Sequence, residues 1–248
     1  MITRLEPKGK NAFLTLLEQD PLFGGRIATA LDCWEGKDAV CGFYQIDDTA
    51  ALLVQGGGAL LCGAVAPEQA AELTAFLRFA GAGTLTARTP CLPGRQVQLA
   101  ELCRPAGWRG MSFAPPIDVT IRPAPSLWAL RQAGFFAQGD PDGWYADACA
   151  RSARGLAEIW IAEQQGAPVA TAGVYSLRDA PFGGYLTAVE TLPDWRGRGY
   201  ALALVDALAR KCGEDRPLRL ICAPQLLPLY RAAGFEQIGT VWEIQPGE

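Results

Sequence analysis

Histidine is absent from this sequence of 248 residues. Because histidine is the usual proton acceptor near neutral pH and the commonest zinc ligand, its absence excludes Ser-His-Asp and Cys-His catalysis and removes the main zinc donor. A general base must therefore be a carboxylate, an amine or a water molecule. The eight cysteines form no C-x-x-C pair, and most stand in apolar segments. We predict buried thiols and no metal site.

Three further features are missing: a membrane-spanning apolar run, a leader-like start and an excess of positive charge. The longest apolar stretch, residues 50–66, is interrupted by Gln55 and three glycines, a pattern that favours two strands joined by a turn. The chain opens on a polar, mixed segment and its net charge is −4. Such a chain has no broad positive field for nucleic acid. We expect a cytoplasmic protein that binds neither membrane nor nucleic acid.

The length and the apolar content, half of all residues, allow two domains. Composition changes at Pro115 and Pro116, so we predict one domain over residues 1–115 and a second domain over 118–248. Both halves run through strands, a helix and a further strand, an order typical of layered α/β folds. The repeated order suggests an internal duplication.

The expected elements follow from hydrophobic period and turn residues. In the first half the expected helical segment covers residues 11–31 and is broken at Pro21 and at Gly24-Gly25. The other elements there are strands 39–46, 50–55 and 59–65, helix 66–81 and strand 83–88. In the second half they are strand 119–124, helices 126–137 and 141–156, strands 157–164, 167–177 and 183–192, helix 200–212, strand 217–223, helix 225–235 and strand 236–244.

The segment Arg196-Gly197-Arg198-Gly199 stands between a predicted strand and a predicted helix. Free amide groups at a helix start, with the positive end of the helix dipole, attract an anion. Glycines let phosphate oxygens approach the main chain, and arginines add charged donors. No P-loop pattern is present, and the last position of a dinucleotide fingerprint would fall on Leu202, which is too bulky. The segment predicts a diphosphate site.

These residues resemble the acetyl-CoA motif of the GNAT superfamily of acyl-CoA N-acyltransferases. The motif, Gln/Arg-x-x-Gly-x-Gly/Ala, appears as residues 196–201, and "PLYRAAGF", residues 228–235, resembles the second family signature. The resemblance covers about residues 118–248. It implies two GNAT-like α/β domains in tandem, with mixed, mostly antiparallel sheets flanked by helices. The junction at 61–73 in the first half lacks the motif, so that domain is expected to be degenerate or accessory.

The resemblance also implies the co-substrate and the binding residues. Acetyl-CoA would donate an acetyl group directly to a primary amine of a small molecule or peptide, without a metal. Main-chain groups near Val189 and Thr191 would hold the thioester. The pyrophosphate would be held by Arg196, Gly197, Arg198, Gly199, Tyr200 and Ala201. The state expected is a monomer or a homodimer.

Two side chains are candidates for proton transfer. Glu190 ends a strand among apolar neighbours, where partial burial would suit a general base acting directly or through water. The alternative is an exposed carboxylate at a strand end. A tyrosine hydroxyl, with a pKa of about 10, can protonate a thiolate, and the resemblance places Tyr230 as the general acid. The alternative is a core aromatic. Gly234 and Phe235 are expected to end and pack its helix.

Other readings stay open. Carboxylates at 140, 142 and 147, beside Trp144 and Tyr145, would either hold a cationic amine or begin a helix. The family often has Asn seven residues before the helical tyrosine, whereas this chain has Ala223. That difference keeps a non-catalytic acyl-CoA sensor, or pseudoenzyme, as the alternative function. A second alternative is an interaction module in which the Arg/Gly segment has no ligand.

Overall fold

The computed structural model describes residues 1–37, 39–137, 139–179 and 181–247. Its contacts divide the chain into two compact units, each built from segments that are separated in the sequence. Unit 1 comprises Met1–Glu101, Ile221–Pro224 and the segment from Gly239 onward, and unit 2 comprises Leu102–Leu220 and Gln225–Ile238. Two long strands, β6 (Gly94–Arg104) and β12 (Glu236–Pro246), have residues in both units.

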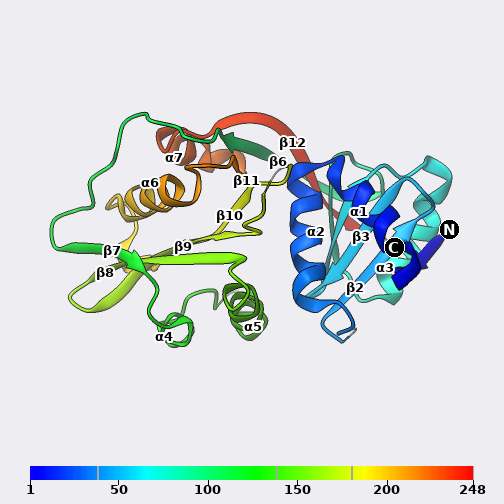
Figure 1. The fold of residues 1–248 in the computed structure, drawn as a ribbon, viewed down its shortest axis with the longest axis horizontal. Coiled ribbons are helices and arrows are strands. Elements are labelled where there is room, and N and C mark those ends of the chain that lie inside the picture. The colour runs from blue at the N-terminus through cyan, green and yellow to red at the C-terminus, as the bar shows by residue number, and fades with distance from the viewer. Residues whose placement is uncertain (38, 138, 180, 248) are drawn as a thin grey trace. The chain divides into compact units, whose positions relative to one another are not determined.

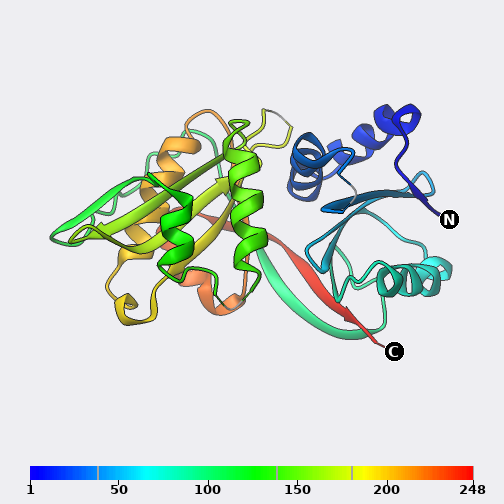
Figure 2. The same ribbon diagram turned by 90° about the horizontal axis from the view of Figure 1, so that it is seen from below.

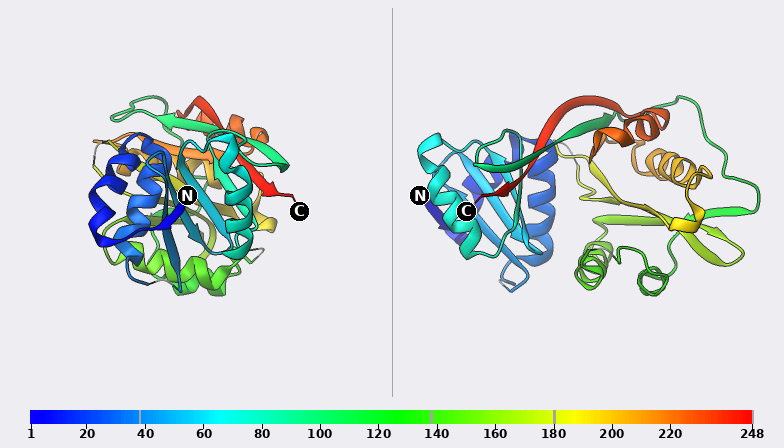
Figure 3. Two further views of the ribbon diagram at one scale, coloured as in Figure 1. Left: turned by 90° about the vertical axis from the view of Figure 1, so that its right-hand side faces the viewer. Right: turned by 180° about the vertical axis from the view of Figure 1, so that it is seen from behind.

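Unit 1 contains a mixed sheet with helices on both faces. Its other elements are β1 (Ile2–Arg4), α1 (Lys10–Glu18), α2 (Pro21–Trp34), β2 (Cys41–Ile46), β3 (Ala50–Gln55), β4 (Gly58–Gly63), α3 (Ala70–Phe79) and β5 (Thr84–Ala87). Strands β1 to β4 pair antiparallel in chain order, β5 pairs parallel with β4, and β12 pairs antiparallel with β5. Helices α1 and α2 lie on one side of the strands and α3 on the other (Figures 2 and 3).

The expected break at Gly24-Gly25 is wrong. Asp20 caps α2 by accepting two first-turn amides at 3.0 Å, and Pro21 opens the helix, which then continues to Trp34. A Cβ on Gly24 would lie 1.8 Å from the carbonyl oxygen of Leu17 in α1. Gly24 therefore serves the close packing of two helices, because only a residue without a side chain fits there.

Unit 2 repeats the same order of elements. They are β7 (Val119–Pro123), α4 (Leu127–Gln132), α5 (Pro141–Ser152), β8 (Ala157–Gln164), β9 (Ala167–Tyr175), β10 (Gly184–Thr191), α6 (Tyr200–Cys212), β11 (Leu218–Cys222) and α7 (Leu227–Ala232). Strands β7 to β10 pair antiparallel in chain order, and β11 pairs parallel with β10. Helices α4 and α5 cover one face of the strands, and α6 and α7 lie on the other side (Figure 1).

Each unit has its own apolar core. In unit 1 α3 packs over β3, β4 and β5, with a buried cluster that includes Ile46, Leu52, Leu61, Leu73, Leu77 and Leu85. In unit 2 α4 and α5 pack over β8 and β9, with a buried cluster that includes Leu130, Phe135, Ala148, Ile159, Ile161 and Tyr175. On the opposite face, Leu204, Val205 and Leu208 of α6 are fully buried, as the amphipathic pattern of that helix predicts.

The predicted fold class, α/β with mixed and mostly antiparallel sheets, is confirmed. Strand β6 was missing from the predicted elements, because its first five residues are exposed and carry no alternation of apolar side chains. The predicted helix over 126–137 is shorter, because Gly134 and Phe136 take positive φ angles of 88° and 61° after α4. Among the described residues, no helix combines the length and hydrophobicity required to cross a bilayer.

Candidate active site

The loop between β10 and α6 has the backbone that an anion site requires. A single 3-10 turn, Pro193–Trp195, leads into Arg196, which is extended. Gly197 and Gly199 follow with φ of 74° and 84°. An added Cβ would meet no atom within 4 Å at either glycine. The positive φ angles, rather than crowding, therefore favour glycine at both positions.

The first turn of α6 carries no capping side chain. Gly199 is the N-cap residue, with φ 84° and ψ 0°, and the first turn contains no acidic residue. The carbonyl of Gly199 accepts from the amide of Ala203 at 3.1 Å, which begins the helix. The amides of the first turn have no partner inside a helix and are left facing the loop. Together with the helix dipole they form a site for a negatively charged group.

The side chains of Arg196 and Arg198 are exposed, and each donates a hydrogen bond to a main-chain carbonyl. Arg196 donates through Nε to the carbonyl of Thr191 at 3.1 Å, and Arg198 donates through Nη2 to the carbonyl of Asp194 at 2.9 Å. The Arg198 guanidinium also lies 4.9 Å from the Trp195 ring. Each guanidinium has five N–H donors, so both keep donors for phosphate oxygens.

Tyr200 fixes the start of α6 through its side chain. It is 4% exposed, and its hydroxyl donates to Oε1 of Gln164 at the end of β8, at 3.0 Å. Its ring also lies 6.1 Å from that of Trp195. The next residue, Ala201, is half-buried. Tyr200 and Ala201 therefore present main-chain amides, rather than functional side chains, to the loop.

Strand β10 is interrupted by a bulge beside this loop. Thr187 pairs with Gly173 of β9, but Glu190 pairs with Thr171, and Ala188 between them takes φ of 52°. Among the described residues, the parallel register of β10 with β11 ends at Tyr185. Bulges redirect side chains and leave backbone groups outside the ladder. Val189 therefore lies where the ladder with β9 is interrupted, whereas Thr191 pairs again with Ala170, and its carbonyl accepts from Arg196.

Glu190 is tied to the loop between α4 and α5. Its Oε2 accepts the main-chain N–H of Phe136 at 2.7 Å. The Phe136 ring packs on Trp144 with 4.3 Å between centroids. The carboxylate is half-buried, and its other oxygen keeps lone pairs for a further contact. Glu190 thus combines an acidic group with a structural contact that the sequence did not predict.

Tyr230 lies in the last turn of α7, where the chain forms a Schellman turn. The amide of Phe235 donates to the carbonyl of Tyr230, and that of Gly234 to the carbonyl of Arg231, both at 3.0 Å. The rings of Tyr230 and Phe235 meet edge to face at 6.1 Å. This combination of bonds and apolar contact is typical of the motif. The prediction that Gly234 and Phe235 end and pack the helix is confirmed.

The acidic residues of α5 have local partners. Asp140 caps the helix by accepting from Gly143 at 2.9 Å, Asp142 pairs with Arg131 at 2.8 Å, and Asp147 pairs with Arg151 at 2.7 Å. These contacts favour the helix-start reading of this segment. Burial of the neighbouring Tyr175 hydroxyl, with Asp147 nearby, raises the pKa of that group.

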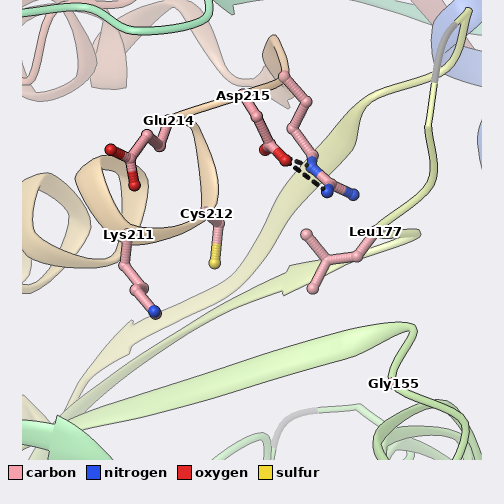
Figure 4. Close-up of a pocket in the computed structure, with 7 residues that line it drawn as sticks. Gly155, Leu177, Lys211, Cys212, Glu214 and Asp215 are labelled. Atoms are coloured by element: carbon pink, nitrogen blue, oxygen red, sulfur yellow. Dashed lines mark hydrogen bonds and ion pairs between the residues drawn. The ribbon is translucent and has the colours of Figure 1, made fainter.

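A hollow in unit 2 lies at the opposite end of α6 from the loop (Figure 4). Its volume is about 410 Å³, and its lining residues are Gly155, Leu177, Lys211, Cys212, Glu214, Asp215 and Arg216. Asp215 and Arg216 pair with each other at 2.9 Å. Burial raises the pKa of the Cys212 thiol to about 12, so this thiol is not a nucleophile at neutral pH. None of the predicted site residues lines this hollow.

The sequence did not predict a buried ion pair between Asp206 of α6 and Arg104 of β6. Asp206 is 1% exposed and pairs with Arg104, which is 2% exposed, at 3.2 Å. Burial lowers the pKa of the Arg104 guanidinium, and Asp206 opposes that effect. The available signal was a single acidic residue within the apolar face of the predicted helix 200–212. Its partner lies about a hundred residues away, so the pattern alone did not identify it.

Comparisons with known proteins bear on the family of one segment and on the fold. Residues 124–235 match the model of the acetyltransferase (GNAT) family. This segment is therefore similar to the acetyltransferase domain of that family. A search of curated proteins returned no match to the sequence.

Solved structures extend the likeness to the whole chain. A tandem GNAT protein from the clavulanic acid biosynthesis pathway has a TM-score of 0.65 and 14% identity, covering 100% of this chain and 99% of its own. A Drosophila protein aligns with a TM-score of 0.67, 13% identity and 98% of both chains. A GCN5-related N-acetyltransferase from Sphaerobacter thermophilus has a TM-score of 0.62 and 18% identity, over 100% and 96%. The fold is that of tandem GNAT proteins.

Proposed function

We propose that the protein is an acetyl-CoA-dependent N-acetyltransferase that acts on a primary amine of a small molecule or peptide. One observation carries this proposal: the uncapped start of α6, preceded by Gly197 and Gly199 with positive φ, lies inside the segment that matches the acetyltransferase (GNAT) family. In this proposal the amides of residues 196–201 hold the pyrophosphate of coenzyme A, and Arg196 and Arg198 add charge-assisted bonds.

We propose that the thioester binds beside the bulge in β10. Because the main chain around Val189 leaves the ladder with β9 between Thr187 and Glu190, its polar groups can bind the pantetheine arm and the acyl carbonyl. A main-chain N–H directed at the carbonyl oxygen stabilises the negative charge that develops as the amine attacks. Val189 and Thr191 supply these groups in the proposal.

The reaction needs two proton transfers. The amine nitrogen forms a bond to the thioester carbon, the carbon–sulfur bond breaks, and the sulfur leaves as a thiolate. Glu190 takes the proton from the amine, directly or through a water molecule, with the oxygen that Phe136 does not occupy. Tyr230 gives its hydroxyl proton to the thiolate. No metal takes part in this scheme.

Unit 1 is proposed as an accessory domain. Its corresponding junction, between β4 and α3, has no Arg-Gly pair and begins α3 with Glu72 in the first turn. In this proposal residues 1–115 form the accessory domain, and residues 118–248 form the catalytic domain.

One observation favours a second candidate, an acyl-CoA sensor without turnover. Ala223 stands where the family often has Asn, so a polar contact near the cofactor is replaced by a methyl group. Both candidates share the cofactor loop, and they differ only in the release of free thiol.

Calorimetry and a thiol-release assay test the proposal together. We expect one acetyl-CoA per chain, and Gly199→Asp to weaken binding by on the order of 100-fold, because a carboxylate would meet the pyrophosphate. The matched control is Gly81→Asp in unit 1. Gly81 also has positive φ, 70°, with no atom within 4 Å of an added Cβ.

The outcomes separate the candidates. Binding with thiol release on some members of an amine panel supports the transferase. Binding with no release on any amine supports the sensor. Equal affinities for wild type and Gly199→Asp would remove the loop from the site and leave the interaction module as the reading of the Arg/Gly segment.

A further inference from the structure

A segment outside the matched GNAT domain is built into unit 2. Residues 102–113, here called the brace, follow the last unit 1 residue of β6 and precede the family match, which begins at residue 124. The brace contributes Arg104, Trp108 and the segment 110–113 to contacts with α6 and with the turn after α7. These contacts join residues that are about 100 positions or more apart.

Asp206 of α6 is the anchor for both ends of the brace. Its carboxylate accepts from Arg104 Nη1 at 3.2 Å and from the main-chain N–H of Phe113 at 3.1 Å. Arg210, one turn later in α6, donates through Nε to the same carboxylate at 3.0 Å. Arg210 Nη2 also donates to the carbonyl of Gly110 at 2.9 Å. The brace is therefore held to α6 by charged and main-chain groups, of which the Arg104–Asp206 bond is buried and the bond to Gly110 is exposed.

The brace also holds the turn that ends α7. Arg104 Nη1 donates to the carbonyl of Ala233 at 2.9 Å. Trp108 lies against Gly234, where an added Cβ would come within 2.4 Å of the indole ring. The Arg104 guanidinium lies 4.2 Å from the centre of that ring. Arg104 and Trp108 thus connect α6 to Ala233 and Gly234.

That turn sets the position of Tyr230. The Schellman bond from the Phe235 amide closes on the carbonyl of Tyr230 itself, at 3.0 Å. Any shift of Ala233 or Gly234 is transmitted to Tyr230 through this bond and through the contact of the Tyr230 and Phe235 rings. The side chain is 6% exposed, so it cannot compensate by moving freely in solvent.

A contribution to stability alone does not explain why Arg104, Asp206 and Arg210 form an ionic cluster here. Buried ion pairs are often no more stabilising than apolar residues of the same volume. Arg104 Nη2 is buried with no hydrogen-bond partner among the described residues, which adds a cost. Hydrogen bonds are directional, whereas apolar packing is not. The charged groups therefore fix the orientation of α6 relative to the turn after α7.

We propose that the brace is a positioning element, in which Arg104 and Trp108 hold the Tyr230 hydroxyl in place relative to the helix that binds the cofactor. The inference rests on the proposed function, because it assigns the brace to the step in which Tyr230 protonates the leaving thiolate. Arg104 and Trp108 act through Tyr230 and do not touch the reacting atoms.

A double-mutant cycle in the full chain measures this coupling. Arg104→Lys keeps the charge but loses the planar guanidinium, whose Nη1 donates to both Asp206 and Ala233 and which lies against the Trp108 ring. We expect kcat to fall about tenfold to a hundredfold, as for small misplacements of a catalytic group, while KM for acetyl-CoA changes less than about twofold. In a Tyr230→Phe background the same change should alter kcat less than about twofold.

Hydrogen exchange supplies a readout that does not depend on activity. In Arg104→Lys we expect the amides of Gly234 and Phe235 to lose protection by about tenfold relative to wild type. The matched control is Arg109→Lys, because Arg109 belongs to the brace but is 72% exposed. This control should leave both exchange and kcat unchanged. If Arg104→Lys does not fold, Trp108→Phe, which weakens the contacts of the indole ring with Gly234 and with the Arg104 guanidinium, takes its place in both experiments.

Each outcome decides a separate point. Lost protection together with a non-additive cycle supports the brace. Unchanged protection at Gly234 and Phe235, or equal kcat losses with and without the Tyr230 hydroxyl, overturns it. A wild-type chain that releases no thiol with any amine overturns the proposed function, and the exchange result alone then decides whether the brace holds the turn.

Discussion

The helix starts of the two units occupy the same place in the fold but differ in chemistry. Each follows the fourth strand of its antiparallel run and a 3-10 turn that begins with proline, Pro67 in unit 1 and Pro193 in unit 2. In unit 1, Gln69 is the N-cap of α3, with φ of −87°. In unit 2, four residues separate the turn from α6, and two of them are glycines with positive φ.

The charge at the two helix starts has the opposite sign. Glu72 stands in the first turn of α3 and accepts the main-chain N–H of Ile2 at 3.0 Å, and Glu68 precedes it in the 3-10 turn. A carboxylate of the protein itself thus lies where the positive end of the helix dipole would attract an anion. The same strand-turn-helix order thus carries different chemistry: the start of α6 adds two glycines with positive φ, and its first turn contains no acidic residue.

The largest effect within this comparison concerns Tyr230. Tyr230→Phe removes the proposed proton donor, so kcat should fall on the order of 100-fold while the affinity for acetyl-CoA is kept. The matched change in unit 1 is Tyr44→Phe, at a half-buried tyrosine whose ring meets Phe76 at 4.7 Å. Steady-state kinetics should show no effect there. Equal turnover in Tyr230→Phe and wild type would take Tyr230 out of the mechanism.

A smaller effect is expected at Glu190, where unit 2 has a carboxylate beside the bulge. Glu190→Gln keeps an oxygen that can accept the Phe136 amide, so the loop stays in place and only the proton acceptor is lost. We expect kcat to fall about tenfold or more, mainly at low pH, where more of the amine is protonated. Rates measured across pH 6 to 9 check this, with pH values chosen around the amine of the substrate. A loss that does not vary with pH would favour a water molecule held by other groups.

The smallest effect compares buried thiols, one in each unit. Burial raises the pKa of Cys62 in β4 to about 12, and likewise that of Cys212 in α6. Unfolded thiols release their protons above pH 9, the ordinary value, whereas the folded ones keep theirs up to about pH 12. The unfolded state then binds fewer protons, so the free energy of unfolding falls as pH rises through this window.

Urea unfolding at pH 8 and pH 10 measures this loss. Each thiol should account for about 1.4 kcal/mol at pH 10. Cys62→Ala and Cys212→Ala should each reduce the difference between the two pH values by that amount, and the cavity left by either change is the same at both pH values. A variant with the full wild-type pH dependence would show that its thiol titrates normally in the folded state.

Much of the fold was predictable from local patterns. The helix expected over 200–212 and the strand expected over 157–164 have the observed bounds. Amphipathic period and flanking glycine or proline mark such elements without reference to the rest of the chain. The expected break at Gly24-Gly25 was wrong because the reason for that glycine is a neighbouring helix, which a local pattern does not contain.

The candidate site divides in the same way. Residues 196–201 were identified because glycine, arginine and a helix start are neighbours in sequence. The bond from Phe136 to Glu190 and the bonds from Arg104 to Asp206 and Ala233 were not identified, because they join residues from 54 to 129 positions apart. The tandem arrangement of two GNAT-like domains was expected from the sequence, and the likeness to solved structures confirms it as the fold of the whole chain.

The sequence by itself determined the absence of histidine chemistry, the backbone freedom of the loop between β10 and α6, and the order of strands and helices, since each depends on residue type or on neighbours along the chain. The tertiary structure alone decided which carboxylate is buried against which arginine, and which backbone groups hold Glu190 and Tyr230 in place. The physical reason is that burial and hydrogen-bond geometry depend on what packs nearby in space, and distant segments meet only when the chain has folded.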